Sequence, residues 1–68
     1  MSKGILTARE REIVELLILN KSTKEISTYL GISEKTVRNH ISNVMQKMNV
    51  KGRSGAIIEL LKLGEINL

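Results

Sequence analysis

The stretch from Ser33 to Met48 constrains the fold most, because it has the pattern of a long helix with one apolar and one polar face. Its apolar residues recur at helical spacing: Val37, Ile41, Val44, Met45 and Met48. The opposite face and its flanks carry polar and basic residues: Lys35, Arg38, Asn39, Ser42, Asn43 and Gln46. Such side chains suit base edges and phosphates. For this helix considered alone, an ordinary solvated surface is the default interpretation.

Length and composition limit the fold class. Sixty-eight residues make one domain, 1–68, with a small core that a partner subunit would help to stabilise. Proline and cysteine are absent and the apolar periods are helical throughout, so we predict an all-α domain without disulfides. No apolar run approaches the ~20 residues of a membrane span and no signal peptide opens the chain. We expect a cytoplasmic protein without membrane contact, cofactor, metal or small-molecule ligand.

The positive charge of the chain is concentrated in its middle. The net charge is +4, but the segment from Lys21 to Arg53 holds seven basic and two acidic residues, and the remainder is slightly acidic. This asymmetry is typical of a surface that binds a polyanion. A membrane-binding helix would place large apolar groups opposite its cations. The outer face of the basic helix is polar, which favours nucleic acid.

Two capping-box patterns precede this helix and define two shorter ones. Thr7 with Glu10 predicts a helix to about Leu19, in which Glu10 is a cap residue and not a catalytic acid. Ser22 with Glu25 predicts a second helix that ends at Leu30. The residues before the first box, Met1–Gly4, are expected to form a disordered lead.

The second and third helices fit a helix-turn-helix, over about 22–48. Gly31 supplies the positive φ of a tight turn, and Ser33 is a good N-cap for the helix that follows. Ser27 is small enough to let the two helices cross closely, and Val37 fills the angle between them. The only aromatic residue, Tyr29, is expected to pack at the edge of the core, with base stacking a distant second.

A fourth helix is predicted over about 54–64, with Ser54 as its cap and Gly64 as its stop. It is apolar on two sides, and a domain of this size can bury only one of them. We assign Ala56, Ile57 and Leu60 to the core. The other side would then form a dimer interface: Ile58 and Leu61, with Lys62 and Glu65 at its rim.

Together these residues resemble the LuxR/FixJ-type helix-turn-helix family. The resemblance runs from about Leu6 to Gly64 and is carried by the motifs Leu6-Thr-x-Arg-Glu-x-Glu-Ile13, Lys24-Glu-Ile26, Lys35-Thr-Val37, His40-Ile-Ser-Asn43 and Lys47-Met48. The runs 32–43 and 50–54 look most like a stand-alone member that controls sporulation genes. Most members carry an N-terminal receiver or ligand-binding domain that this sequence does not contain, and the start at Met1 favours a complete chain.

The resemblance implies a homodimeric transcription regulator that binds double-stranded DNA through its third helix and, we expect, contacts RNA polymerase. Positions matching Arg38, Asn39 and Ser42 face base edges in related regulators, and we add Asn43 to this set. Positions near phosphates match Thr23, Lys24, Lys35, Thr36 and Lys47. The sole histidine, His40, matches a recurrent family position, for which a structural or phosphate-adjacent role is far more probable than catalysis.

Three other interpretations fit the sequence less well. Region 4 of a sigma factor shares the first helix and the turn, but it would need a promoter-melting domain that 68 residues cannot hold. A protein-interaction module built on the same scaffold should have an acidic or apolar outer face, and this face is basic and polar. An enzyme is disfavoured because no nucleophile–base pair, metal cluster or phosphate loop can be assembled.

Overall fold

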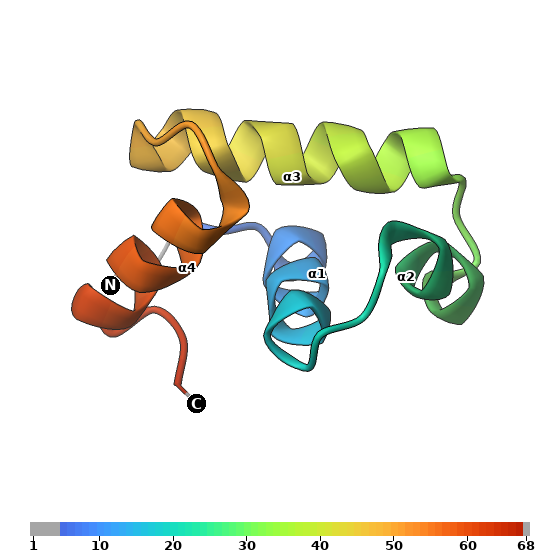
Figure 1. Ribbon diagram of the computed structural model, residues 1–68, viewed down its shortest axis with the longest axis horizontal. Coiled ribbons are helices and arrows are strands. Elements are labelled where there is room, and N and C mark those ends of the chain that lie inside the picture. The colour runs from blue at the N-terminus through green and yellow to red at the C-terminus, as the bar shows by residue number, and fades with distance from the viewer. Residues whose placement is uncertain (1–4, 68) are drawn as a thin grey trace.

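The longest helix spans one side of the molecule and the other three pack against it (Figure 1). The structure is a computed structural model and describes residues 5–67. Within this range it contains four helices and no strand: α1 (Ala8–Ile18), α2 (Thr23–Leu30), α3 (Glu34–Met48) and α4 (Arg53–Lys62). The predicted all-α, four-helix architecture is confirmed. The disordered lead predicted at Met1–Gly4 lies outside the described residues.

Side-chain caps start the first three helices where the sequence predicts them. At α1, the Thr7 hydroxyl accepts from the Glu10 N–H at 3.1 Å, and the Glu10 carboxylate accepts from the Thr7 N–H at 2.9 Å. Ser22 and Glu25 form the same reciprocal pair at α2. At α3 the Ser33 hydroxyl accepts from the Thr36 N–H at 3.0 Å. These bonds satisfy backbone donors that a helix leaves unpaired at its N-terminus.

The turn between α2 and α3 has the geometry of a helix-turn-helix. Gly31 adopts φ +71°, a left-handed conformation that costs a residue with a Cβ about 1–2 kcal/mol. Ser27 is buried at the crossing, and its hydroxyl donates to the Lys24 carbonyl at 2.8 Å. Val37 is fully buried. The sequence interpretation of these three positions is confirmed.

The core consists of two hydrophobic clusters that lie along α3. The first joins α1 to the second half of α3 and to α4, and its buried members are Leu6, Val14, Val44, Ala56, Leu60 and Ile66. The second joins α1 to α2 and the first half of α3, and its buried members are Ile13, Ile26, Val37 and Ile41. Met45 packs against both clusters. The core of the domain is therefore divided between its two ends.

Two local predictions are wrong. Ser54 does not cap α4: the N-cap is Gly52, and no side chain bonds to the first turn. Tyr29 does not pack at the edge of the core: it is 77% exposed, because it lies on the side of α2 that faces away from α3. Neither error changes the order or type of the helices.

The uncapped start of α4 generates a prediction about stability. Gly52 has extended geometry (φ −137°, ψ 160°), and a Cβ built there meets nothing within 4 Å. Gly52→Ser should raise the free energy of unfolding by about 0.5–1 kcal/mol, through a new cap and a less flexible unfolded chain. Urea unfolding followed by circular dichroism measures the change. Gly31→Ser is the matched control and should destabilise, since Gly31 has positive φ. Equal effects of the two substitutions would contradict this assignment.

Candidate nucleic-acid interface

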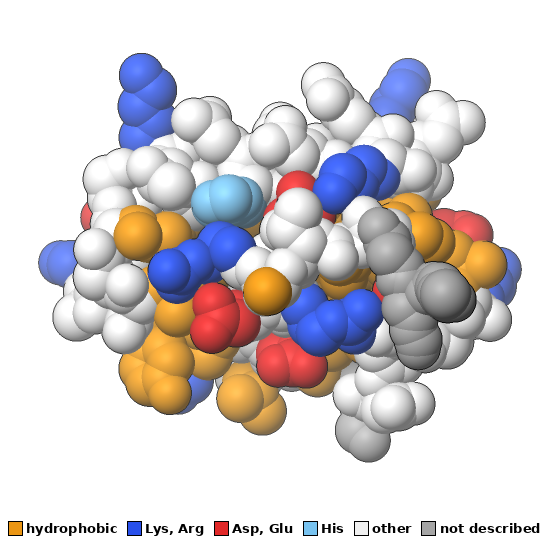
Figure 2. Space-filling model, turned by 180° about the vertical axis from the view of Figure 1, so that it is seen from behind, with side chains coloured by type: hydrophobic (Ala, Val, Ile, Leu, Met, Phe, Trp, Pro, Cys, Tyr) orange, Lys and Arg blue, Asp and Glu red, His pale blue; other side chains and the backbone are white. Residues whose placement is uncertain are grey.

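The outer side of α3 forms a continuous polar and basic surface. Val37, Ile41 and Val44 are buried, so the packing of α3 turns its other side to solvent. Figure 2 views the molecule from behind and shows white polar and blue basic side chains along the upper edge, where α3 runs, with orange hydrophobic side chains lower down. All four predicted base-contacting residues are exposed on this helix, as are two of their neighbours: Lys35, Arg38, Asn39, Ser42, Asn43 and Gln46.

Arg38 is the residue of this surface with the most directional chemistry. Its guanidinium presents a planar fork of donors that matches the O6/N7 edge of guanine. In the structure Nη1 lies 3.6 Å from Oε1 of Glu34, one turn earlier on α3. Both side chains are exposed, and such pairs contribute about 0.3–0.5 kcal/mol on a helix. A stronger partner for Arg38 can therefore replace Glu34 at little cost.

Four of the five predicted phosphate contacts surround the first turns of α2 and α3. Lys24 and Lys35 are exposed, whereas Thr23 and Thr36 are half-buried. The Thr36 hydroxyl lies 2.9 Å from the Ser33 hydroxyl. The Thr23 hydroxyl accepts from Nη2 of Arg53 at 3.2 Å, which connects the start of α4 to the start of α2. The N–H groups at a helix N-terminus favour anions, and the two lysines add positive charge beside them.

The fifth, Lys47, is already engaged within the protein. Its Nζ lies 2.6 Å from Oε1 of Glu10 and 3.0 Å from the carbonyl oxygen of Ile5. The prediction placed Lys47 at phosphate, but two of its three donors are used by α1 and the residues before it. The Lys47 side chain is still 37% exposed, so one donor remains available on the surface.

Glu10 is the buried partner of this ion pair, with only 3% of its surface exposed. Burial by itself raises the pKa of Glu10, but hydrogen bonds from Lys47 and the Thr7 N–H, together with the charges of Lys47 and His40, outweigh it and lower the pKa. Glu10 is therefore a charged cap residue that also ties α1 to α3. The predicted capping role is confirmed, and the ion pair is an addition to it.

The exposed side of α4 matches its prediction only in part. Ile58 is 51% exposed, and Leu63 just beyond the helix is also exposed. Leu61 is half-buried and packs against the first core cluster, so it serves the core as well as the surface. Glu65 does not form an exposed rim: its side chain is mostly buried, and its carboxylate lies 3.0 Å from Nη2 of Arg11. Arg11 also donates to the Glu65 carbonyl, which ties the end of the chain to α1.

Sequence reasoning missed these tertiary polar contacts because their partners lie 30 to 54 residues apart. One feature of the sequence does indicate a contact of this kind. Glu10 falls within the apolar stripe of α1, and a buried carboxylate needs a cation or several hydrogen-bond donors. That requirement indicates a basic partner from another helix, although it does not say which one.

The fold and this surface define a helix-turn-helix protein. The family model described as "Bacterial regulatory proteins, luxR family" matches residues 4–60. The chain belongs to this family, and it is a transcriptional regulator and not an enzyme. The expected LuxR-type resemblance is confirmed. None of the helices within residues 5–67 is both long and apolar enough to cross a membrane.

Individual relatives agree with this assignment. The spore germination protein GerE of Bacillus subtilis (strain 168) is 66% identical over 67 residues, covering 98% of this chain and 90% of GerE. The transcriptional regulatory protein DegU of Brevibacillus brevis is 47% identical over 64 residues, which are 94% of this chain but 27% of DegU. A solved structure of the transcription factor GerE is 64% identical, with a TM-score of 0.90, and covers 94% of this chain and 96% of that one.

The ion pair between Glu10 and Lys47 predicts an acid-sensitive stability. Because folding lowers the pKa of Glu10, its stabilising contribution is complete above the ordinary value of 4.5 and is lost as the pH falls through the lower folded value. Glu10→Gln should cost about 1.5–3 kcal/mol at pH 7 and flatten the loss of stability below pH 4.5. Urea unfolding at a series of pH values measures both effects.

The exposed Glu12, which pairs with Arg9 at 3.5 Å on the same helix, supplies the control. Glu12→Gln should change the free energy of unfolding by less than about 0.5 kcal/mol. If Glu10→Gln and Glu12→Gln behaved alike at every pH, the ion pair would have no part in stability.

Proposed function

We propose that this protein is a homodimeric regulator that binds specific double-stranded DNA sequences with the outer side of α3. The observation that carries the proposal is the polar and basic surface of α3, which the packing of the helix leaves open to solvent. The major groove accommodates an α-helix and presents donors and acceptors that differ for every base pair. The residues proposed to contact bases are Arg38, Asn39, Ser42 and Asn43.

Phosphate contacts fix the position of such a helix on the duplex without selecting a sequence. We assign this role to the surface around the starts of α2 and α3: Thr23, Lys24, Lys35 and Thr36. Lys47 is assigned mainly to Glu10, with its remaining donor free for a phosphate. Lys47→Met should therefore lower the free energy of unfolding. It should leave the salt dependence of DNA binding nearly unchanged.

A homodimer would use the exposed side of α4. Ile58 and Leu63 are large apolar side chains in water, and burial of each in a two-fold interface contributes roughly 1.5–3 kcal/mol. Leu61 and Lys62 lie beside them on the same helix. Such a pairing would hold two copies of α3 in successive major grooves, about one turn of DNA apart, and the binding site would be an inverted repeat.

The cellular role follows from the comparisons by analogy. The 66% identity to a spore germination protein supports a role in sporulation gene control. A regulator of transcription acts where the chromosome and RNA polymerase are, so we assign the protein to the bacterial cytoplasm with RNA polymerase as a partner. The luxR-family match excludes a sigma-factor module, and DNA-binding measurements distinguish this proposal from a pure interaction module on the same scaffold.

Base recognition is tested by Arg38→Ala. Loss of a bidentate contact should cost about 1–3 kcal/mol in binding and relax the preference at one base pair of each half-site. The measurement is selection of bound fragments from random DNA, sequenced for both proteins. Arg9→Ala removes the same charge from α1 and should leave the preference intact. If Arg38→Ala bound the same sequences as the parent protein, α3 would not be the base-contacting helix.

The dimer is tested by Ile58→Glu. Because Ile58 is exposed and outside both core clusters, the charge should dissociate the dimer without loss of helix content. Analytical ultracentrifugation gives the mass and circular dichroism the helix content. Leu60 lies two residues further along the same helix and is fully buried, so Leu60→Glu should instead unfold the protein. A dimer that survives Ile58→Glu would place the interface elsewhere.

A further inference from the structure

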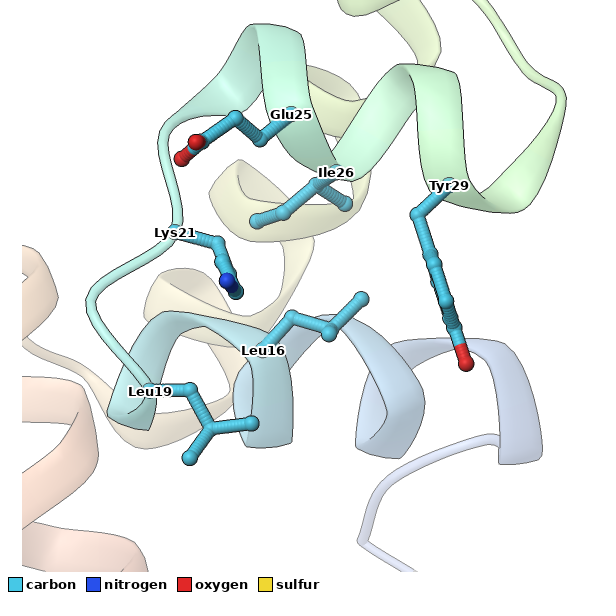
Figure 3. A pocket seen from close by; sticks show the side chains of 6 residues that line it. All are labelled: Leu16, Leu19, Lys21, Glu25, Ile26 and Tyr29. Carbon is cyan, nitrogen blue, oxygen red and sulfur yellow. The ribbon is translucent and has the colours of Figure 1, made fainter.

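The side of α1 and α2 that faces away from α3 carries a groove that lies over the core residue Ile26 and outside the proposed DNA surface. One part, about 320 Å³, is lined by Leu16, Leu19, Lys21, Glu25, Ile26 and Tyr29 (Figure 3). A second part, about 230 Å³, shares three of these residues and extends toward Glu12, Glu15 and Leu30. We call the two parts together the α1–α2 groove.

Two large side chains of the groove are exposed to solvent. Leu19 is 66% exposed and Tyr29 is 77% exposed, and they lie at opposite ends of the groove (Figure 3). Leu16 lies between them at the floor. Leucine and tyrosine exposed together around a hollow are typical of a surface that a partner covers. Tyrosine suits such a place because it buries a large ring and keeps its hydroxyl at the rim.

The rim of the groove is acidic. Glu12, Glu15 and Glu25 contribute three carboxylates against the single cation of Lys21. Glu12 pairs with Arg9, and Glu25 is used in the cap of α2. Glu15 forms no salt bridge within residues 5–67. The acidic rim therefore favours a ligand that carries positive charge beside its apolar side chains.

We propose that the α1–α2 groove docks a basic amphipathic helix of a partner protein. Leucine-sized side chains would enter between Leu19 and Tyr29, and flanking Lys or Arg side chains would meet Glu12 and Glu15. A second copy of this chain does not fit, since its excess basic residues lie on the surface assigned to DNA. The groove opens away from α3, so DNA and the partner can bind together; this point and the exclusion of a second copy rest on the proposed function.

The probe is a synthetic amidated helical peptide with leucines along one face and lysines on both sides of them. The ¹⁵N-labelled protein is titrated with this peptide without DNA, and with a peptide in which every lysine is replaced by glutamate. We expect chemical-shift changes confined to the groove for the basic peptide and none for the acidic one. Shifts centred on α3 or α4, or equal binding of both peptides, would overturn the proposal.

Three variants make the test specific. Leu19→Ser and Glu15→Lys should each weaken peptide binding about tenfold, since one removes an apolar anchor and the other reverses a rim charge. Thr28→Ala changes an exposed residue of α2 that does not line the groove and should bind the peptide like the parent. The three positions are not fully buried, so circular dichroism should show folded protein in each case. Unchanged peptide affinity of Leu19→Ser would refute the groove as the docking site.

Two further measurements separate this proposal from the others. Leu19→Ser should keep the sedimentation mass of the parent, and a lower mass would mean that the groove binds a second copy, against the proposal. Leu19→Ser should also keep the DNA affinity of the parent. If the parent itself failed to bind DNA, the proposed function would fail while the peptide titration would still decide the groove.

Discussion

The structure depends on one constraint: α3 must bury one side against three helices while its other side stays polar and in water. Val37, Ile41 and Val44 satisfy the first requirement, and each contributes roughly 1.5–3 kcal/mol by leaving water. Since α1, α2 and α4 all contact α3, the same packing that stabilises the domain fixes the orientation of the exposed side. A change in the core would therefore tilt the surface as well as weaken the fold.

Polar contacts between distant parts of the chain refine this arrangement. The ion pair of Glu10 with Lys47 fixes the second half of α3 over α1. Arg53 bonds Thr23 and so connects the ends of two other helices. Glu10 is buried and a buried acceptor needs a partner, so its pairing with Lys47 disfavours neighbouring packings in which the two do not meet, whereas the bond between Arg53 and Thr23 is exposed. Hydrophobic contacts alone tolerate small shifts far better.

The sequence predicts the helices well because each has local signals at its ends. Capping bonds and left-handed turns involve residues only a few positions apart, as at Thr7, Ser22, Ser33 and Gly31. Helical periodicity then identifies the buried side of each helix. The prediction that Ser54 caps the fourth helix is wrong because α4 already begins at Arg53, with Gly52 as its N-cap. The engagement of Lys47 and Glu65 could not be predicted, since a charged residue on a helix flank is compatible with either solvent or a distant partner until the packing is known.

The division of the core into two clusters has a consequence for how such a domain can evolve. One cluster stabilises the helix-turn-helix and the first half of α3, and the other stabilises α4 and the second half of α3. Substitutions in separate clusters are expected to have nearly additive effects on the free energy of unfolding. The residues of one cluster can therefore change without compensating changes in the other. Among residues 5–67 only Met45 packs against both, and its flexible thioether can adapt to a new neighbour on either side. The surface at one end of the scaffold can thus change while the packing at the other end is inherited unchanged.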